Sequence, residues 1–129
     1  MPLFTDLKIS RNLEKALDDL GFENTTPIQE KAFPIVMSGS DVVGIAQTGT
    51  GKTFAYLLPI LNTLSFSKEI HPKVIILVPT RELVVQVVEE AEKLAKYSGI
   101  RVLGVFGGKS MLRQKDALAL GTDILVATP

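Results

Sequence analysis

The chain has 129 residues, and its 14 lysines and arginines balance 14 aspartates and glutamates, which argues against a basic coat that binds nucleic acid through bulk charge. The absence of cysteine excludes disulfides, a thiol nucleophile and Cys-based zinc sites, and a single histidine argues against a histidine-rich metal site. A hydrophobic fraction of 46% is typical of a globular domain. The apolar runs are too short to span a bilayer and no signal sequence is evident, so we expect a cytoplasmic protein.

Residues 1–40 carry the signals of two helices. The first is predicted to begin after Ser10 and to end at Gly21. The second begins at Thr26, because Pro27 suits the first helical position and Gln29 completes a Thr-x-x-Gln capping box. We assign this stretch to the same domain as the core that follows.

Residues 41–129 alternate between strand and helix patterns. Apolar runs predict strands at 42–46, 74–78, 102–106 and 124–127, and helical periodicity predicts helices at 53–64, 82–97 and 111–120. This order is typical of an α/β fold in which helices flank a parallel β-sheet. The last strand is followed at once by Thr128-Pro129, where such a sheet normally continues into a helix. We therefore expect the core over 41–129 to be incomplete at its C-terminus.

A phosphate-binding loop is predicted at residues 46–53, which read AQTGTGKT between a predicted strand and a predicted helix. Glycine lets backbone N–H groups approach a phosphate, and the helix N-terminus adds partial positive charge. The lysine would reach the outer phosphates and the following threonine would ligate Mg²⁺. The usual pattern opens with glycine where this chain has Ala46, and a plain glycine-rich turn is the alternative. The predicted nucleotide-binding residues are Thr48, Gly49, Thr50, Gly51, Lys52 and Thr53, with Lys52 and Thr53 assigned catalytic roles.

Three further stretches accompany this loop in a fixed order. Residues 21–29 read GFENTTPIQ, with Phe4 seventeen positions before the glycine. Residues 79–83 read PTREL. The pair Gly107-Gly108 comes next, and the chain ends in Ala127-Thr128-Pro129. Together with the loop, they resemble the first half of a DEAD-box RNA helicase over residues 4–129. Two departures stand out: Thr25 replaces a common proline, and Val84-Val85 replaces frequent alanine. Neither removes a functional side chain, and the resemblance implies a RecA-like phosphate-loop fold.

The resemblance implies that adenine is the recognised base. In that family an upstream aromatic ring stacks on the base, which here would be Phe4, and the motif's glutamine reads its Hoogsteen edge, which here would be Gln29. An amide suits this role because it offers one donor and one acceptor to the adenine N6/N7 pair. From the residues alone, Gln29 equally fits a helix cap and Phe4 a hydrophobic lid on the first helix.

The resemblance also implies an RNA side at the C-terminal ends of the strands, where open α/β sheets bind ligands. Small residues would let the RNA backbone approach peptide N–H groups, and an arginine would donate two parallel hydrogen bonds to one phosphate. Such contacts carry no base information, so binding would be independent of sequence. The alternatives are a helix start at 79–82, a structural ion pair for Arg81 and a plain turn at Gly107-Gly108. The predicted RNA-binding residues are Pro79, Thr80, Arg81, Gly107, Gly108 and Thr128.

The implied function is an ATP-dependent RNA helicase that unwinds short duplexes, with ATP and Mg²⁺ as cofactors. The resemblance implies that the family's Asp-Glu-Ala-Asp stretch, its Ser-Ala-Thr stretch and its second ATPase domain would lie beyond Pro129. No predicted strand here is followed by Asp-Glu, and Asp123 precedes its strand, so it sits at the wrong end of the sheet. We therefore expect residues 1–129 alone to be inactive and to expose an unpaired sheet edge prone to self-association. The alternatives are another phosphate-loop ATPase, such as a DNA helicase, and a non-enzymatic nucleotide- or RNA-binding module.

Overall fold

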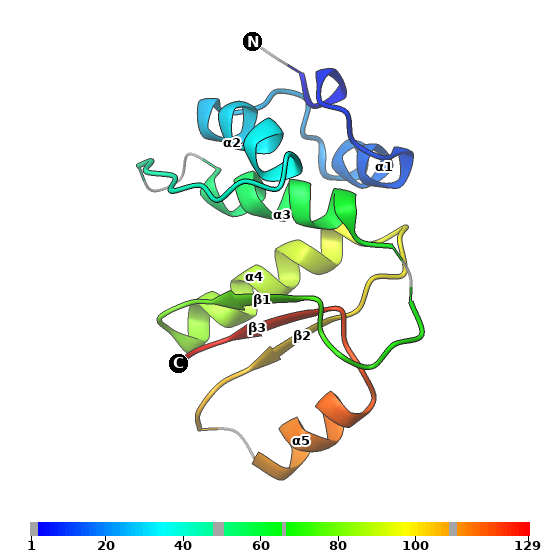
Figure 1. The fold of residues 1–129 in the computed structure, drawn as a ribbon, viewed down its shortest axis with the longest axis vertical. Coiled ribbons are helices and arrows are strands. Elements are labelled where there is room, and N and C mark those ends of the chain that lie inside the picture. The colour runs from blue at the N-terminus through cyan, green and yellow to red at the C-terminus, as the bar shows by residue number, and fades with distance from the viewer. Residues whose placement is uncertain (1–2, 48–50, 66, 109–110) are drawn as a thin grey trace. The chain divides into compact units, whose positions relative to one another are not determined.

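The computed structural model describes residues 3–47, 51–65, 67–108 and 111–129. The chain divides into two compact units, Met1–Leu64 and Ser65–Pro129, which Figure 1 draws as a ribbon. The predicted division of the domain at residue 40 stays a prediction. Within the described residues, no helix has the length and apolar character needed to cross a membrane.

The first unit is helical. It contains the 3-10 turn η1 (Phe4–Asp6), α1 (Arg11–Leu20), α2 (Pro27–Met37) and α3 (Lys52–Thr63). The predicted caps of α1 are present: Ser10 Oγ accepts the Leu13 N–H at 3.3 Å, and Gly21 ends the helix with φ of 77°. The core of this unit is formed by apolar side chains of the three helices: Leu13, Ala16, Leu17, Ala32, Phe33, Ala55, Leu57, Leu58 and Leu61.

Asn62 joins the end of α3 to the segment that leads into α1. Its Oδ1 accepts the Ser10 N–H at 2.7 Å, and its Nδ2 donates to the Lys8 carbonyl at 3.1 Å. One amide therefore satisfies two backbone groups just before α1, where no helix or sheet supplies partners.

The strand predicted at residues 42–46 is wrong, because residues 41–47 form no regular secondary structure. Alternate residues of this segment nevertheless face α2. Val42 and Gly44 line a pocket with Ile28 of α2, whereas Val43 and Ile45 are 90% and 91% exposed. A strand needs a neighbouring strand for its backbone hydrogen bonds, and the described residues of this unit contain none. Apolar patterning alone could not reveal that missing partner.

The second unit is a three-stranded parallel sheet with helices packed against it, which confirms the predicted α/β fold class. Its elements are β1 (Val74–Leu77), α4 (Arg81–Leu94), β2 (Val102–Val105), α5 (Met111–Ala119) and β3 (Ile124–Ala127). The strand order is β1-β3-β2. In the register, Leu77 and Val105 both pair with Ala127, so the three strands end in one row.

Helix α4 packs closely on β2 because Gly104 has no side chain. A Cβ at this position would lie 2.7 Å from Val84 Cγ1 and 2.9 Å from Val88 Cγ2. Both distances are shorter than any contact that real Cβ atoms make, and valine methyl groups cannot swing away as a long side chain would. The inner face of α4 therefore fits against β2 only because residue 104 has no side chain.

Asp123 joins neighbouring segments at the N-terminal ends of the three strands. Its carboxylate accepts the Arg101 backbone N–H at 2.8 Å and the Arg101 side chain at 3.2 and 3.0 Å, while its own carbonyl accepts the Lys73 N–H at 2.9 Å. Burial alone would raise the pKa of Asp123, but hydrogen bonds and positive charge from Arg101, with a contribution from Lys73, bring the pKa below its ordinary value. As expected, this aspartate lies before β3, away from the C-terminal strand ends.

We expect Gly104→Ala to destabilise the protein by about 1–3 kcal/mol, the usual cost of overpacking a core. Urea denaturation measures the change. The matched control is Gly107→Ala, because a Cβ at Gly107 meets nothing within 4 Å. In the double variant with Val84→Ala, the loss should be smaller than the sum of the two single losses. Strict additivity would contradict the close fit between α4 and β2.

A second expectation concerns acid unfolding. Because the folded-state pKa of Asp123 is lowered, its carboxylate contributes stability that is fully present above its unfolded-state pKa of about 3.9 and is lost as the pH falls through the folded-state pKa. Asp123→Asn should therefore be less stable at neutral pH and lose less additional stability below about pH 4. Denaturation across this range, with the exposed Asp116→Asn as control, measures both effects. Parallel pH profiles for wild type and Asp123→Asn would overturn this assignment.

Candidate functional site

The start of α3 has the geometry of an anion-binding site. Gly51 precedes the helix with φ of 83°, and its carbonyl accepts the first helical bond, from the Ala55 N–H at 3.1 Å. The N–H groups of residues 52–54 therefore have no acceptor inside the helix. Lys52 is exposed and Thr53 half-buried in this first turn. Of the predicted loop residues, Thr48, Gly49 and Thr50 lie outside the described part of the chain.

Gln29 connects α2 to this turn. Its Oε1 accepts the Thr26 N–H at 2.9 Å, which is the glutamine half of the predicted capping box, and its Nε2 donates to the Gly51 carbonyl at 3.2 Å. The side chain is 3% exposed. One buried amide thus satisfies a backbone group of the residue before α2 and one of the residue before α3, which lies twenty-two positions after Gln29.

Only glycine fits at position 51. A Cβ there would lie 2.3 Å from Gln29 Nε2 and 3.0 Å from Thr26 Oγ1, and the positive φ already disfavours any other residue. Thr26 Oγ1 is itself buried and has no hydrogen-bond partner among the described residues. Within the described residues, Thr26 Oγ1 is therefore a buried oxygen without a hydrogen bond, and it lies next to the predicted phosphate loop.

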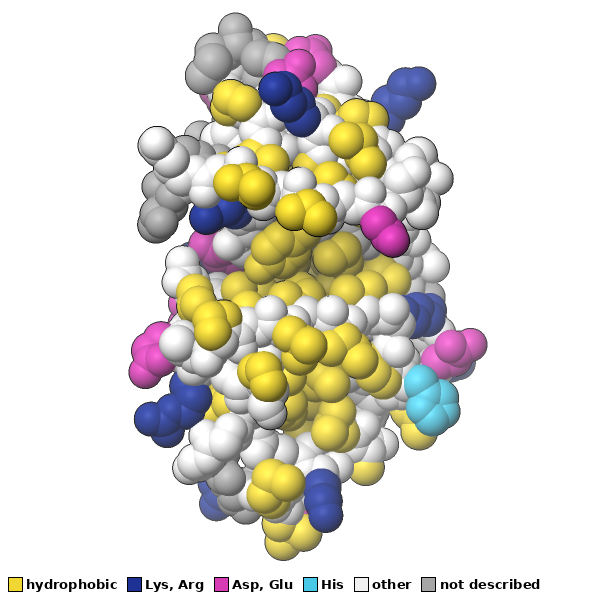
Figure 2. All heavy atoms as spheres, turned by 60° about the vertical axis from the view of Figure 1, so that its left-hand side comes forward, with side chains coloured by type: hydrophobic (Ala, Val, Ile, Leu, Met, Phe, Trp, Pro, Cys, Tyr) yellow, Lys and Arg dark blue, Asp and Glu magenta, His cyan; other side chains and the backbone are white. Residues whose placement is uncertain are grey.

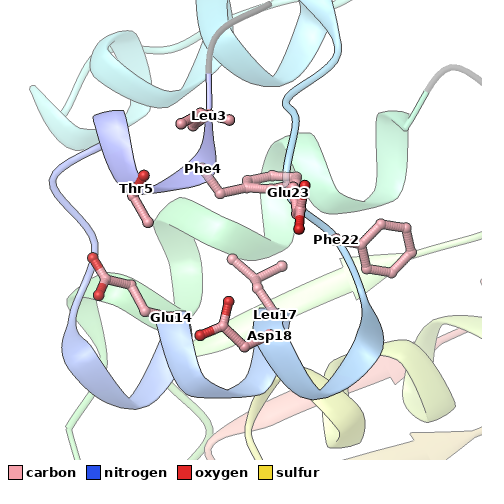
Figure 3. A pocket seen from close by; sticks show the side chains of 8 residues that line it. All are labelled: Leu3, Phe4, Thr5, Glu14, Leu17, Asp18, Phe22 and Glu23. Atoms are coloured by element: carbon pink, nitrogen blue, oxygen red, sulfur yellow. The ribbon is translucent and has the colours of Figure 1, made fainter.

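Phe4 lies beneath the surface. It is 3% exposed, its backbone N–H donates to the Glu23 carbonyl at 2.9 Å, and its ring lines a pocket of about 180 Å³ with Leu17 (Figure 3). This is the position expected of the hydrophobic lid. A base could stack on this ring only after neighbouring side chains move, so the role of Phe4 in stacking stays a prediction.

Phe22 is the aromatic side chain that sequence reasoning missed. It is 45% exposed and points away from Phe4 in Figure 3. Its ring packs edge to face on Phe54, in the first turn of α3, with centroids 5.2 Å apart. Phe22 stands in the GFENTTPIQ stretch itself, but spacing along the chain does not reveal which of two aromatics is exposed.

The predicted RNA-binding residues gather at the C-terminal ends of the strands. Pro79 and Thr80 follow β1, and Thr80 Oγ1 caps α4 by accepting the Leu83 N–H at 3.2 Å. Arg81 opens α4 and lies against Gly108, since a Cβ at Gly108 would be 2.8 Å from Arg81 Nη1. The helix start that the sequence offered as an alternative is therefore present, and Arg81 remains exposed beside it.

Gly107 and Thr128 belong to the same edge of the sheet. Both line a pocket of about 360 Å³ between the ends of β2 and β3 and helix α5, and the Thr128 N–H donates to the Val105 carbonyl at 3.4 Å. Figure 1 shows α5 beside the strands, on the side away from α4. The parallel register explains why residues so far apart in the sequence meet here.

A helix start preceded by a left-handed glycine and a parallel sheet with residues gathered at its C-terminal edge are features of phosphate-loop α/β proteins. Comparison with known families identifies the group: the DEAD/DEAH box helicase profile matches residues 26–129. The chain belongs to the DEAD/DEAH box helicase family.

Individual relatives agree. The chain is 42% identical over 127 residues to the ATP-dependent RNA helicase DeaD of Haemophilus influenzae, and 42% identical over 129 residues to the DEAD-box ATP-dependent RNA helicase CshA of Bacillus cereus. These alignments cover 98% and 100% of this chain but only 21% and 24% of the relatives. The chain thus spans about a fifth to a quarter of their length.

Solved structures show the same fold. The RNA helicase Prp28 from Chaetomium thermophilum, bound to ADP, superposes with a TM-score of 0.88 at 40% identity, over all of this chain and 32% of that one. A DEAD box protein from Methanococcus jannaschii gives a TM-score of 0.91 at 34% identity, over all of this chain and 35% of the other. The predicted family and RecA-like fold are therefore confirmed.

We expect Gln29→Ala to destabilise the protein by about 1–3 kcal/mol, because it removes two neutral hydrogen bonds worth about 0.5–1.5 kcal/mol each. Gln29→Glu keeps the acceptor for the Thr26 N–H but loses the donor to the Gly51 carbonyl, so it separates the two bonds. Urea denaturation measures both variants, and the exposed Lys31→Ala on the same helix is the control. Stability equal to wild type in Gln29→Ala would show that the bridge between α2 and α3 is not formed in solution.

Proposed function

We propose that the first unit of this chain binds ATP at the start of α3. The observation that carries the proposal is the left-handed Gly51 turn, after which the N–H groups of the first turn of α3 lack helical acceptors. Such a helix start attracts phosphate oxygens through its N–H groups and its dipole. ADP bound to the related Prp28 structure supports nucleotide use in this family.

Two side chains of the first turn would act on the phosphates. Lys52 is exposed at the head of α3, so its ammonium group can meet the outer phosphates. The Thr53 hydroxyl is an oxygen ligand of the kind that Mg²⁺ accepts beside a nucleotide. When bound, Mg²⁺ would neutralise phosphate charge, and the chain's own contribution is to orient the phosphates against the helix. Thr48, Gly49 and Thr50 complete the proposed loop.

Adenine would be read beside this loop. Gln29 uses one lone pair of Oε1 and one hydrogen of Nε2 within the protein, which leaves one acceptor and one donor on the same amide. Phe4 keeps its predicted stacking role as a proposal, and Phe22, which is 45% exposed and lines the same pocket, is a second candidate ring.

The second unit would bind the RNA backbone along the C-terminal edge of its sheet. Arg81 presents a guanidinium group next to Gly108, while Gly107 and Thr128 offer backbone groups at the neighbouring strand ends. Contacts to phosphate and ribose position a strand without reading bases, so binding would be independent of sequence. Pro79 and Thr80 lie at the same edge and complete the proposed RNA surface.

For the whole protein, we propose ATP-dependent unwinding of short RNA duplexes in the cytoplasm. The helicase activity is supported by the names of the relatives, which are ATP-dependent RNA helicases. Residues 1–129 are expected to bind nucleotide and RNA without appreciable turnover, because no described strand is followed directly by an acidic residue. Exposed apolar side chains on the first unit's 42–46 segment and on β1 support the proposed self-association: Val43, Ile45, Ile75 and Leu77. Figure 2 shows apolar side chains reaching the surface on one face of the molecule.

The proposed nucleotide site is tested by Lys52→Ala. Loss of a charge-assisted contact worth about 1.5–3 kcal/mol should weaken ATP binding about 10- to 150-fold. Titration with a fluorescent ATP analogue measures the affinity, and Lys31→Ala controls for the loss of one surface charge. Equal ATP affinity in Lys52→Ala and wild type would refute the proposed site.

Gln29→Ala, titrated with ATP and GTP, should lose preference for ATP.

A further inference from the structure

Helix α5 is attached to the sheet by little apolar packing. None of its described side chains is buried, and Met111 and Leu112 are 67% and 69% exposed. The stretch that links β2 to this helix contains Gly107 and Gly108, whose backbones are proposed to meet RNA. Something other than core burial must therefore set the conformation of this turn.

Gln114, one turn into α5, makes a hydrogen bond to the start of this turn. Its Oε1 accepts the Phe106 backbone N–H at 2.7 Å, at the residue that directly follows β2. Its Nε2 faces Met111 Sδ at 3.9 Å, a weak contact within the same helix. The backbone N–H can only donate, so the orientation of the amide is fixed by Phe106. The side chain is half-buried, which shields this bond from water.

The turn held in this way also bears on Arg81. Gly108 adopts φ of 86°, and a Cβ there would lie 2.8 Å from Arg81 Nη1. Rotation of the chain after Phe106 would therefore move the Gly108 backbone relative to the guanidinium group. Gln114 further lines the pocket that Gly107 and Thr128 share.

We propose that Gln114 is a positioning residue for RNA: its side-chain carbonyl holds the turn at residues 106–108 in the conformation that presents Arg81 and the glycine backbones to one strand. This inference rests on the proposed RNA contact of the second unit. Gln114 itself need not touch RNA. Its effect passes through the Phe106 N–H to the turn, and from Gly108 to Arg81.

The test uses the full chain and a short labelled oligouridylate, with binding followed by fluorescence anisotropy over a series of salt concentrations. Gln114→Leu keeps the volume but removes the acceptor. We expect about 2- to 12-fold weaker binding, as for one neutral hydrogen bond, and a salt dependence flatter by up to about one unit of slope if the Arg81 phosphate contact is lost. Leu112→Ala, exposed on the same helix, is the control and should bind as wild type does.

Coupling separates positioning from general damage. In an Arg81→Ala background, Gln114→Leu should cost clearly less affinity than it does alone, because the two residues act through one contact. Independent, additive losses would overturn the proposal. Hydrogen exchange at the Phe106 amide provides a readout without RNA: it should be faster in Gln114→Leu and return to the wild-type rate in Gln114→Glu, which restores an acceptor.

The outcomes distinguish this inference from the function on which it depends. If wild type binds the oligouridylate and Gln114→Leu binds equally well with the same salt slope, the positioning role is refuted and the RNA surface stands. If wild type shows no binding, the proposed RNA surface fails and the positioning role fails with it. Unchanged exchange at Phe106 in Gln114→Leu would refute the hydrogen bond itself.

Discussion

The buried amide of Gln29 is the interaction on which the candidate nucleotide site depends. It joins the residue before α2 to the residue before α3 through hydrogen bonds of 2.9 and 3.2 Å. Both partners are backbone groups, so the link fixes chain direction rather than one side-chain position. Gly51 must stay bare for the amide to fit, which makes the left-handed turn and the capping box parts of a single arrangement.

In the second unit, different polar contacts hold the two ends of the parallel sheet. At the N-terminal ends of the strands, the Asp123 carboxylate accepts hydrogen bonds from the backbone and side chain of Arg101, and the Asp123 carbonyl accepts one from the Lys73 N–H. At the C-terminal ends of the strands, the described residues form no comparable charged cluster. Thr80 caps α4 and Gln114 holds the Phe106 N–H. The ion pair and the residues proposed to meet RNA therefore lie at opposite ends of the strands.

Local signals in the sequence predicted the helices well, because a helix satisfies its own backbone. Ser10 and Gly21 bound α1 as expected, and the helix predicted at 82–97 differs only in starting at Arg81 and ending at Leu94. The strand predicted at 42–46 failed because strands depend on partners distant in sequence. The same limit applies to the site: motif spacing singled out Gln29 and predicted the loop, but it left open whether Phe4 is a lid or a stacking ring, and the bond of Gln114 does not follow from local pattern. Both depend on three-dimensional packing.

The close approach of α4 to β2 has a consequence for how this sequence can diverge. Gly104 is bare where Val84 and Val88 project into the sheet, so the space is shared between strand and helix. Relatives with alanine at the helix position that is Val84 here would leave room for a larger residue in the strand, and relatives with a large strand residue would require a small one in the helix. Positions 84 and 104 should therefore vary as a pair across the family, with the summed side-chain volume held nearly constant, and a substitution acceptable in one member would be disfavoured in another.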